Sequence, residues 1–321
     1  MEKVVLVTGS SGFIGSVLVE GLLSEGYKVI GIDLIKSNIK HENFTWYVLD
    51  ITDEKQLNCE ILTDLDIYCV CHLAAKIRVD ESMREPDLYY IHNVTGTINI
   101  LNWCKKRNIR NILFASTAAV YGNPLKEINH GYTEEEAGNP LSVYGRNKLM
   151  CEQIICDYGF SGYIFRFFNV CGGSELNHGT PIHLLPLVVN NIIHGKDISI
   201  FGDTYKTKDG TCVRDYIHLN DISRAFIMCI KNGFRSDKIK IYNLGSGEGY
   251  TVQEIIDKML EIFDRLHPGY TDKIKVIKHD RRPGDFDTLI ANSDLIKNEL
   301  NWKVEYGLEE MITDTIKSFF D

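Results

Sequence analysis

A tyrosine and a lysine four residues apart, Tyr144 and Lys148, are the side chains of this 321-residue sequence best suited to proton transfer. The surrounding pattern predicts a helix over 141–157, on which this spacing places both side chains on one face. An ammonium group beside a phenol lowers the pKa of the phenol toward neutrality, as a general base requires. One such pair is expected by chance among sixteen tyrosines, but this is the only one, and it follows a predicted strand that ends in the hydroxyls of Ser116 and Thr117. We therefore expect a catalytic site here.

Three glycines near the start of the chain, Gly9, Gly12 and Gly15, lie between an apolar strand-like run and a predicted helix over 13–24. Glycine in such a turn lets the backbone approach a pyrophosphate, and the free amides of the helix then face the phosphates. The pattern predicts a dinucleotide-binding turn that includes Phe13 and Ile14, with a purely structural turn as the alternative.

Asp33 ends the second predicted strand, 28–33, where a carboxylate can bind the diol of an adenosine ribose. It would repel a 2′-phosphate, so NAD is expected as the cofactor rather than NADP. The alternative is a solvated loop acid.

Two further strand ends are candidate cofactor contacts. Asp50 and Ile51 could face the adenine, although a cap for a helix over 53–61 is an equal explanation. The small side chains after His72 leave space for a cofactor, although close packing of the sheet alone would also explain them. They are Leu73, Ala74 and Ala75.

Strand-like and helix-like segments alternate along the chain, which predicts an α/β fold with a doubly wound, mostly parallel Rossmann sheet. We expect a dinucleotide-binding domain over 1–169 and, interleaved with it, a smaller mixed α/β substrate lobe over 170–321. Ligands bind beyond the carboxyl ends of the strands in such sheets, where the two lobes meet. The predicted strands are 3–8, 28–33, 45–49, 67–72, 110–115, 162–167, 198–201, 213–217 and 240–243, and the predicted helices are 13–24, 53–61, 86–106, 141–157, 183–193, 219–231, 251–263 and 308–319.

Composition limits the function. A net charge of −9 argues against general binding to nucleic acid. The sequence has no run of eighteen apolar residues, so no membrane span is predicted. The nine cysteines are scattered and without a Cys-x-x-Cys pair, so we expect buried reduced thiols and no metal site. Because the chain starts directly with a strand, no signal peptide is expected, and a cytoplasmic location follows.

Several strings of residues resemble one family. The chain is similar to extended short-chain dehydrogenases/reductases in T-G-S-S-G-F-I-G, in H-L-A-A, in V-Y-G after the strand-ending hydroxyls and in Y-G-R-N-K. It resembles UDP-glucose 4-epimerases in R-F-F-N (166–169), I-F-G-D (200–203), D-G-T-C-V-R-D-Y-I-H (209–218), I-Y-N-L-G-S-G (241–247) and R-R-P-G-D (281–285). The similarity covers essentially the whole chain, and the string over 213–218 is far more specific than the glycine turn.

The resemblance implies that Tyr144 takes the proton of the sugar 4-hydroxyl, that Thr117 hydrogen-bonds the same oxygen, and that Lys148 holds the nicotinamide ribose. It implies that NAD⁺ stays bound, accepts the hydride of carbon 4 and returns it to the opposite face of the 4-keto sugar, interconverting UDP-glucose and UDP-galactose, and that the protein is a homodimer. The implied cofactor residues include Asn93, Ser116 and Phe167. The implied substrate residues are Thr117, Asn169, His183, Leu184, Phe201 (against the uracil), Arg214, Tyr216, Val252, Arg282, Asp285 and Leu289.

Two arginines, Arg214 and Arg282, are suited to clamp a diphosphate in this acidic protein. The alternative for either one alone is a surface ion pair.

Three positions depart from the family's usual pattern. Ile77 replaces a frequent lysine, and Phe167 replaces a frequent tyrosine. Leu289 stands at the sugar-pocket position where the family's tyrosine closes the pocket to N-acetyl groups and small residues open it.

Other functions remain as alternatives. Epimerisation of UDP-N-acetylglucosamine needs only a wider pocket. A nucleotide-sugar 4,6-dehydratase typically has Asp-Glu after the strand-ending threonine, where this chain has Ala118 and Ala119. A non-catalytic NAD-binding regulator typically lacks the tyrosine–lysine pair, which is intact.

Overall fold

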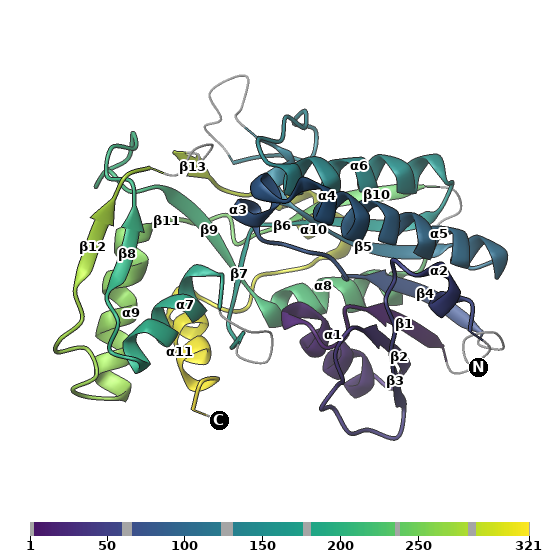
Figure 1. Ribbon diagram of the computed structural model, residues 1–321, viewed down its shortest axis with the longest axis horizontal. Coiled ribbons are helices and arrows are strands. Elements are labelled where there is room, and N and C mark those ends of the chain that lie inside the picture. The colour runs from purple at the N-terminus through teal and green to yellow at the C-terminus, as the bar shows by residue number, and fades with distance from the viewer. Residues whose placement is uncertain are drawn as a thin grey trace.

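A parallel seven-stranded sheet forms the centre of the computed structural model, which describes residues 3–59, 66–122, 131–175, 181–234, 238–281 and 287–320. The strand order is β10-β6-β5-β4-β1-β2-β3 (Figure 1). These strands are β1 (Val4–Thr8), β2 (Lys28–Asp33), β3 (Phe44–Val48), β4 (Ile67–His72), β5 (Asn111–Thr117), β6 (Ser161–Phe167) and β10 (Ile239–Leu244). The predicted α/β fold with a parallel sheet is confirmed.

Helices cover both faces of this sheet, which explains why its strands are apolar without alternation. One face packs against α1 (Phe13–Ser24) and α8 (Leu219–Asn232). The other packs against α5 (Gly96–Lys106) and α6 (Val143–Asp157). Shorter helices lie beside these two: α2 (Glu54–Leu57), α3 (Val79–Arg84) and α4 (Pro86–Tyr89).

The second half of the chain builds a smaller lobe at the other end of the molecule (Figure 1). A second sheet joins β7 (Asn169–Cys171), β9 (Val213–His218), β11 (Gly249–Thr251) and β13 (Thr288–Leu289). A parallel pair, β8 (Ile198–Phe201) and β12 (Val276–His279), lies beside α7 (Leu184–Ile193), α9 (Val252–Leu266) and α11 (Leu308–Lys317).

Three elements of the second half of the chain pack against the first half or its sheet. Strand β10 pairs with β6 at the edge of the large sheet, α8 packs on α1, and α10 (Asp294–Leu300) contacts both β10 and α8. The two halves of the chain therefore share one sheet and one core.

Some predicted elements differ from the structure. The predicted helix over 53–61 is wrong in length, because α2 ends at Leu57, where the Asn58 side chain donates a hydrogen bond to the Glu54 carbonyl at 2.8 Å. The predicted helix over 86–106 is interrupted between α4 and α5 by a π-helical turn, η2 (Tyr90–Thr95). The short elements α3, α10, β7, β11, β12 and β13 were not predicted.

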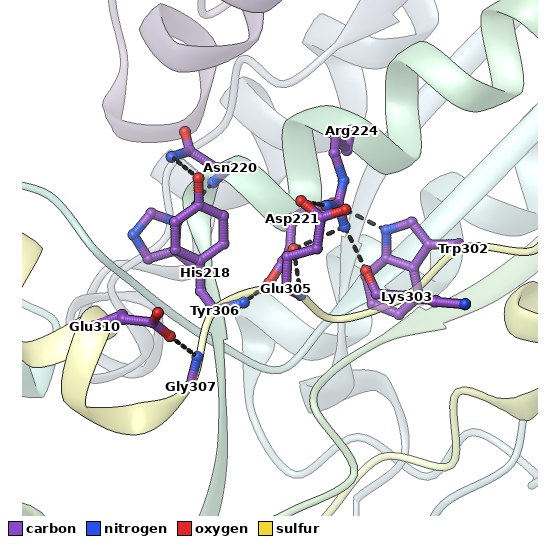
Figure 2. Close-up of polar contacts among 10 residues, drawn as sticks. All are labelled: His218, Asn220, Asp221, Arg224, Trp302, Lys303, Glu305, Tyr306, Gly307 and Glu310. Carbon is purple, nitrogen blue, oxygen red and sulfur yellow. Dashed lines mark hydrogen bonds and ion pairs between the residues drawn. The ribbon is translucent and has the colours of Figure 1, made fainter.

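The segment between α10 and α11 is fastened to the start of α8 by a buried carboxylate (Figure 2). The Asp221 carboxylate accepts hydrogen bonds from the Arg224 guanidinium at 2.8 Å and from the Glu305 amide at 3.1 Å. The indole of Trp302, fully buried, donates to the Asp221 carbonyl at 3.1 Å. The ring of Tyr306 stacks on His218, with centroids 4.0 Å apart.

We expect Trp302→Ala to lower the free energy of unfolding by about 3–5 kcal/mol, the usual cost of emptying a buried tryptophan site. Trp302→Phe keeps most of the volume and removes one hydrogen bond, so its cost should be about 1 kcal/mol beyond the packing change. Urea denaturation of both variants measures this. Equal, small losses in both would show that this segment lies outside the cooperative core.

Candidate active site

The site lies where the carboxyl ends of β1 and β4 meet, the point at which the chain changes direction across the sheet. The Thr8 carbonyl accepts a hydrogen bond from the Leu73 amide at 3.1 Å, and the Thr8 hydroxyl accepts one from the Ala74 amide at 3.3 Å. The same hydroxyl bonds the ring of His72 at 2.7 Å. Burial lowers the pKa of His72 to about 3, so this imidazole is a neutral structural group.

The glycine turn presses against this junction. Gly9 has φ +71°, and a Cβ there would lie 2.8 Å from the Ala74 nitrogen. A Cβ on Gly15 would lie 1.9 Å from the Gly9 carbonyl oxygen. Gly12 is the N-cap of α1, and no side chain caps that helix end. The turn therefore leaves a shallow backbone cradle with free amides at Phe13 and Ile14, which fits a dinucleotide pyrophosphate.

Asp33 lies directly beside this turn. Its carboxylate accepts hydrogen bonds from the Ser11 amide at 2.9 Å and from the Ile35 amide at 3.2 Å. Each oxygen keeps a further lone pair, so the group can hold the turn and bind a ribose diol together.

The next predicted cofactor positions lie at the same edge of the sheet. Asp50 accepts from both the amide and the hydroxyl of Thr52 at 2.8 Å, and Ile51 is buried. The N-cap of α2 is Asp53, whose side chain accepts from Lys55, so the alternative of Asp50 as the helix cap is wrong.

Asn93, in the π-helical turn η2, holds the loop that follows β4. Its side chain accepts from the Lys76 amide at 2.8 Å and donates to the Lys76 carbonyl at 3.0 Å. These two bonds define the path of the backbone from Leu73 to Lys76, including the small residues Ala74 and Ala75.

The structure brings Thr117 and Tyr144 together. Their side chains lie close enough for the Thr117 side chain to act on the Tyr144 phenol, and Tyr144 is partly exposed. Burial nevertheless raises the pKa of Tyr144 to about 12, while the neighbouring Thr117 side chain acts in the opposite direction. The expected lowering of this pKa by Lys148 is not found in this structure.

Lys148 is bound to the strand instead. Its ammonium donates to the Ala115 carbonyl at 2.7 Å and lies 4.7 Å from the centroid of the Phe114 ring. Burial lowers the pKa of Lys148 to about 8, against the attraction of Cys151 and Glu152.

Ser116 requires a correction. Its hydroxyl was expected at the cofactor edge, but it is buried and donates to the Glu152 carboxylate at 2.5 Å. Because side chains alternate along a strand, Thr117 faces the site while Ser116 faces α6.

A stacked pair of rings joins the substrate lobe to the glycine turn. His183, at the N-cap of α7, stacks on Phe13 with centroids 5.5 Å apart. Its Nδ1 lies 2.5 Å from the buried Glu175 carboxylate, which also accepts the His183 amide at 3.1 Å.

On the second sheet, Asn169 and Arg214 lie close to Leu289. The Asn169 amide donates to the Asp215 carbonyl at 2.9 Å, and Leu289 pairs with Arg214 across β13 and β9. Leu289 is buried in an apolar cluster with Ala118, the residue that follows Thr117.

The remaining predicted residues are spread more widely. Leu184 opens α7, Val252 opens α9, Tyr216 is buried in the lobe core, and Phe201 stacks on His279 at 5.3 Å. Phe167 is buried in the core of the large sheet. Arg282 and Asp285 lie outside the described residues.

Two carboxylates, Asp215 and Glu152, hold elements near the site by hydrogen bonds, and neither was predicted from the sequence. Asp215 accepts hydrogen bonds from the Ser246 amide and hydroxyl at 2.7 Å, from Gly247 at 2.9 Å and from Ala291 at 3.0 Å. Glu152 lies one helical turn after Lys148, and that spacing was the signal that could have identified it.

Within the described ranges, no group of three His, Cys, Asp or Glu side chains is arranged to hold a metal ion. None of the helices described there is long and apolar enough to cross a membrane.

Comparison with known proteins gives full-length matches. Residues 5–245 match the NAD dependent epimerase/dehydratase family. The chain is 35% identical over 334 residues to a UDP-glucose 4-epimerase of Pasteurella multocida, covering 97% of this chain and 96% of that one. The structure resembles the UDP-glucose 4-epimerase of Bifidobacterium longum in complex with NAD⁺ and UDP, with a TM-score of 0.88, 30% identity and coverage of 99% and 98%. It also resembles the UDP-Glc/GlcNAc 4-epimerase of Campylobacter jejuni, with a TM-score of 0.81, 29% identity and 98% coverage of both chains.

We expect Gly9→Ala to weaken NAD binding by about tenfold or more, a loss of at least about 1.4 kcal/mol, because its Cβ would push away the backbone of Leu73 and Ala74 just after β4. Gly26→Ala is the matched control, since Gly26 has φ +81° and open space around it. Isothermal titration with NAD compares the two. If both variants bind NAD equally well, the close approach at Gly9 is not needed for the cofactor.

Proposed function

Because the chain belongs to the NAD dependent epimerase/dehydratase family, we propose that it is an NAD-dependent isomerase that interconverts UDP-glucose and UDP-galactose. The observation that carries this proposal is that the side chain of Thr117, the last residue of β5, lies against that of Tyr144 on α6, with Lys148 one helical turn further along that helix. The full-length likeness to UDP-glucose 4-epimerases supports the choice of reaction.

In this proposal, residues 1–169 supply the cofactor site. The pyrophosphate binds at Gly9, Gly12, Phe13, Ile14 and Gly15, and the ribose diol at Asp33. Asp50, Ile51, Leu73, Ala74, Ala75, Asn93 and Phe167 complete its surroundings. NAD⁺ held by these residues would supply a hydride acceptor, and in its reduced form a hydride donor, for carbon 4 of the sugar.

Tyr144 is the proposed general base, which takes the proton of the 4-hydroxyl and later gives it back. Thr117 orients the same oxygen through its hydroxyl. Because burial opposes ionisation of the phenol, the base needs nearby positive charge, and Lys148 is the cation on the same helix face.

Residues 170–321, with Asn169, hold the UDP-sugar in this proposal. Arg214 binds the diphosphate from β9, and Arg282 is assigned the same role from the sequence. Phe201 lies against the uracil. The remaining proposed contacts are His183, Leu184, Tyr216, Val252, Asp285 and Leu289.

The structure favours an epimerase over a 4,6-dehydratase at one place. Ala118 and Ala119 follow Thr117 in a 3₁₀ turn, so this turn carries no acid that could promote loss of water.

Tyr144→Phe should fold, retain NAD and lose at least about a hundredfold in epimerisation rate, the usual scale of losing a general base. Assay of UDP-glucose and UDP-galactose interconversion gives the rate, and denaturation releases the dinucleotide for identification. Tyr158→Phe, on a tyrosine that follows the same helix, is the control. A Tyr144→Phe rate above about a tenth of wild type would remove Tyr144 from the mechanism.

The choice of sugar rests on Leu289. A leucine is shorter than a tyrosine and leaves more room beside carbon 2 of the sugar, where an N-acetyl group would lie. A misfit of about one methylene in a pocket changes discrimination by only about 1–3 kcal/mol. We therefore propose UDP-glucose and UDP-galactose as the main pair, with measurable activity on the N-acetylated pair.

Leu289→Tyr should abolish activity on UDP-N-acetylglucosamine and leave activity on UDP-glucose within about threefold, because only the bulkier sugar meets the added ring. Leu295→Tyr, on the exposed face of α10, is the control. Side-by-side assays of both sugars decide the matter. Unchanged relative activities would mean that Leu289 does not limit the pocket.

We also propose that two copies of the chain associate through an apolar face formed by α3, η2 and α6. This face exposes Val79 (48%), Met83 (54%), Ile91 (50%) and Met150 (38%), and α6 contacts both other elements. Exposed apolar patches of this kind mark interfaces, and two-fold dimers are the commonest assemblies. In sedimentation experiments the double variant Met83→Glu, Ile91→Glu should be a monomer, whereas Leu266→Glu on α9 should stay dimeric. A monomeric wild type would contradict the proposal.

A cytoplasmic location is proposed as well. The nine cysteines, all of which lie in the described ranges, form no disulfide with one another, and most are buried. Thiols persist in this form in a reducing compartment.

A further inference from the structure

Glu152, one helical turn beyond Lys148 on α6, is the centre of a buried polar network. Its carboxylate accepts hydrogen bonds from the Ser116 hydroxyl at 2.5 Å and from two nitrogens of Arg166, Nε at 3.1 Å and Nη2 at 2.7 Å. The Glu152 and Arg166 side chains are 4% and 6% exposed. One carboxylate thus joins helix α6 to two neighbouring strands, β5 and β6.

The network continues toward the substrate lobe. The Arg166 guanidinium donates to the Tyr121 hydroxyl at 3.1 Å, which donates to the Asn243 side chain at 2.6 Å. The Asn243 amide in turn donates to the carbonyls of Tyr132 at 2.7 Å and Asn292 at 3.3 Å. The chain of bonds therefore reaches the segment just after Leu289.

The bond between Glu152 and Ser116 joins the two elements that carry the proposed catalytic pair, because Tyr144 lies on α6 and Thr117 on β5. Tyr144, Lys148 and Glu152 follow one another at a spacing of four and share one helix face. Ser116 directly precedes Thr117, whose side chain acts on the phenol of Tyr144. A bond from Glu152 to Ser116 therefore controls how far along β5 the helix sits, and with it the register of Thr117 against Tyr144.

Stability alone gives a weak reason for such a pair. The desolvation of a buried ion pair offsets most of its attraction, and apolar replacements are often as stable. The bidentate geometry, in contrast, defines one relative position of α6, β5 and β6.

We propose that Glu152 is a positioning residue that holds α6 in register with β5 and β6, so that Tyr144 and Thr117 meet the same atom of the substrate. This inference rests on the proposed function for its catalytic consequence.

Glu152→Gln is the test, because it keeps the shape but replaces one acceptor oxygen by an amide that cannot accept from Arg166. We expect kcat for UDP-glucose to fall about 10–100-fold, the scale expected for a displacement of about 1 Å, with KM within about threefold of wild type. The rate at which UDP-glucose reduces the bound nicotinamide, followed by absorbance in a single turnover, should fall by the same factor.

Asp221→Asn is the matched control. Asp221 is a buried carboxylate paired with an arginine, and it holds the C-terminal segment rather than the catalytic helix (Figure 2). Asp221→Asn should lower the midpoint of thermal unfolding about as much as Glu152→Gln does, and it should leave kcat near the wild-type value. Ser116→Ala, which keeps the ion pair and removes one bond, should lower kcat about tenfold, and it decides the question if Glu152→Gln does not fold.

Hydrogen exchange provides a readout that does not depend on activity. Glu152→Gln should speed exchange in 115–119 and 143–148 selectively, whereas Asp221→Asn should speed it in 301–307. A kcat for Glu152→Gln equal to that of Asp221→Asn, or uniformly faster exchange, would overturn the positioning role. A wild type inactive on both sugars would refute the proposed function, and the exchange comparison would still decide the role of Glu152.

Discussion

The contact between the glycine turn and the end of β4 is the constraint on which the site depends. The Thr8 backbone and hydroxyl bind the amides of Leu73 and Ala74, and Gly9 leaves no room for a side chain between the two segments. Because the strands are parallel, this contact gathers their carboxyl ends at one edge of the sheet. The uncapped start of α1, the carboxylate of Asp33 and the loop held by Asn93 then lie along this edge.

The second half of the chain is joined to that edge by strands rather than by a linker. β10 completes the large sheet, and α8 packs on α1, so the lobe that carries β9 and β13 has little freedom to move away as a unit. The stacked rings of Phe13 and His183 add a contact directly at the cofactor turn. This arrangement suits a reaction in which the cofactor stays bound between turnovers.

Buried charge organises the region and also limits its chemistry. Burial lowers the pKa of Lys148 to about 8 and raises that of Tyr144 to about 12, so it favours the neutral form of both groups. The helical spacing of Tyr144 and Lys148 by itself therefore does not make the Tyr144 phenol a base. The distance between ammonium and phenol decides it, and that distance depends on how α6 is held against β5.

Local sequence patterns were sufficient for the first six strands of the sheet, the glycine turn between β1 and α1, the place of Asp33 at the end of β2 and the shared helix face of Tyr144 and Lys148, because each follows from the periodicity or spacing of neighbouring residues. They predicted the strand β10 but not its place in the large sheet. They were not sufficient for the short strands β7 and β13, which exist through pairing with the distant strand β9, or for the short helix α3, which packs on α6. The opposite orientations of Ser116 and Thr117 show the same limit: strand alternation separates them, but only the packing of α6 determines which one faces the site. The same holds for the path from Glu152 through Arg166 and Tyr121 to Asn243, because Tyr121 and Asn243 are 122 residues apart in the chain. Hydrogen bonds between distant segments leave no periodic trace in a sequence, so only the tertiary structure could reveal them.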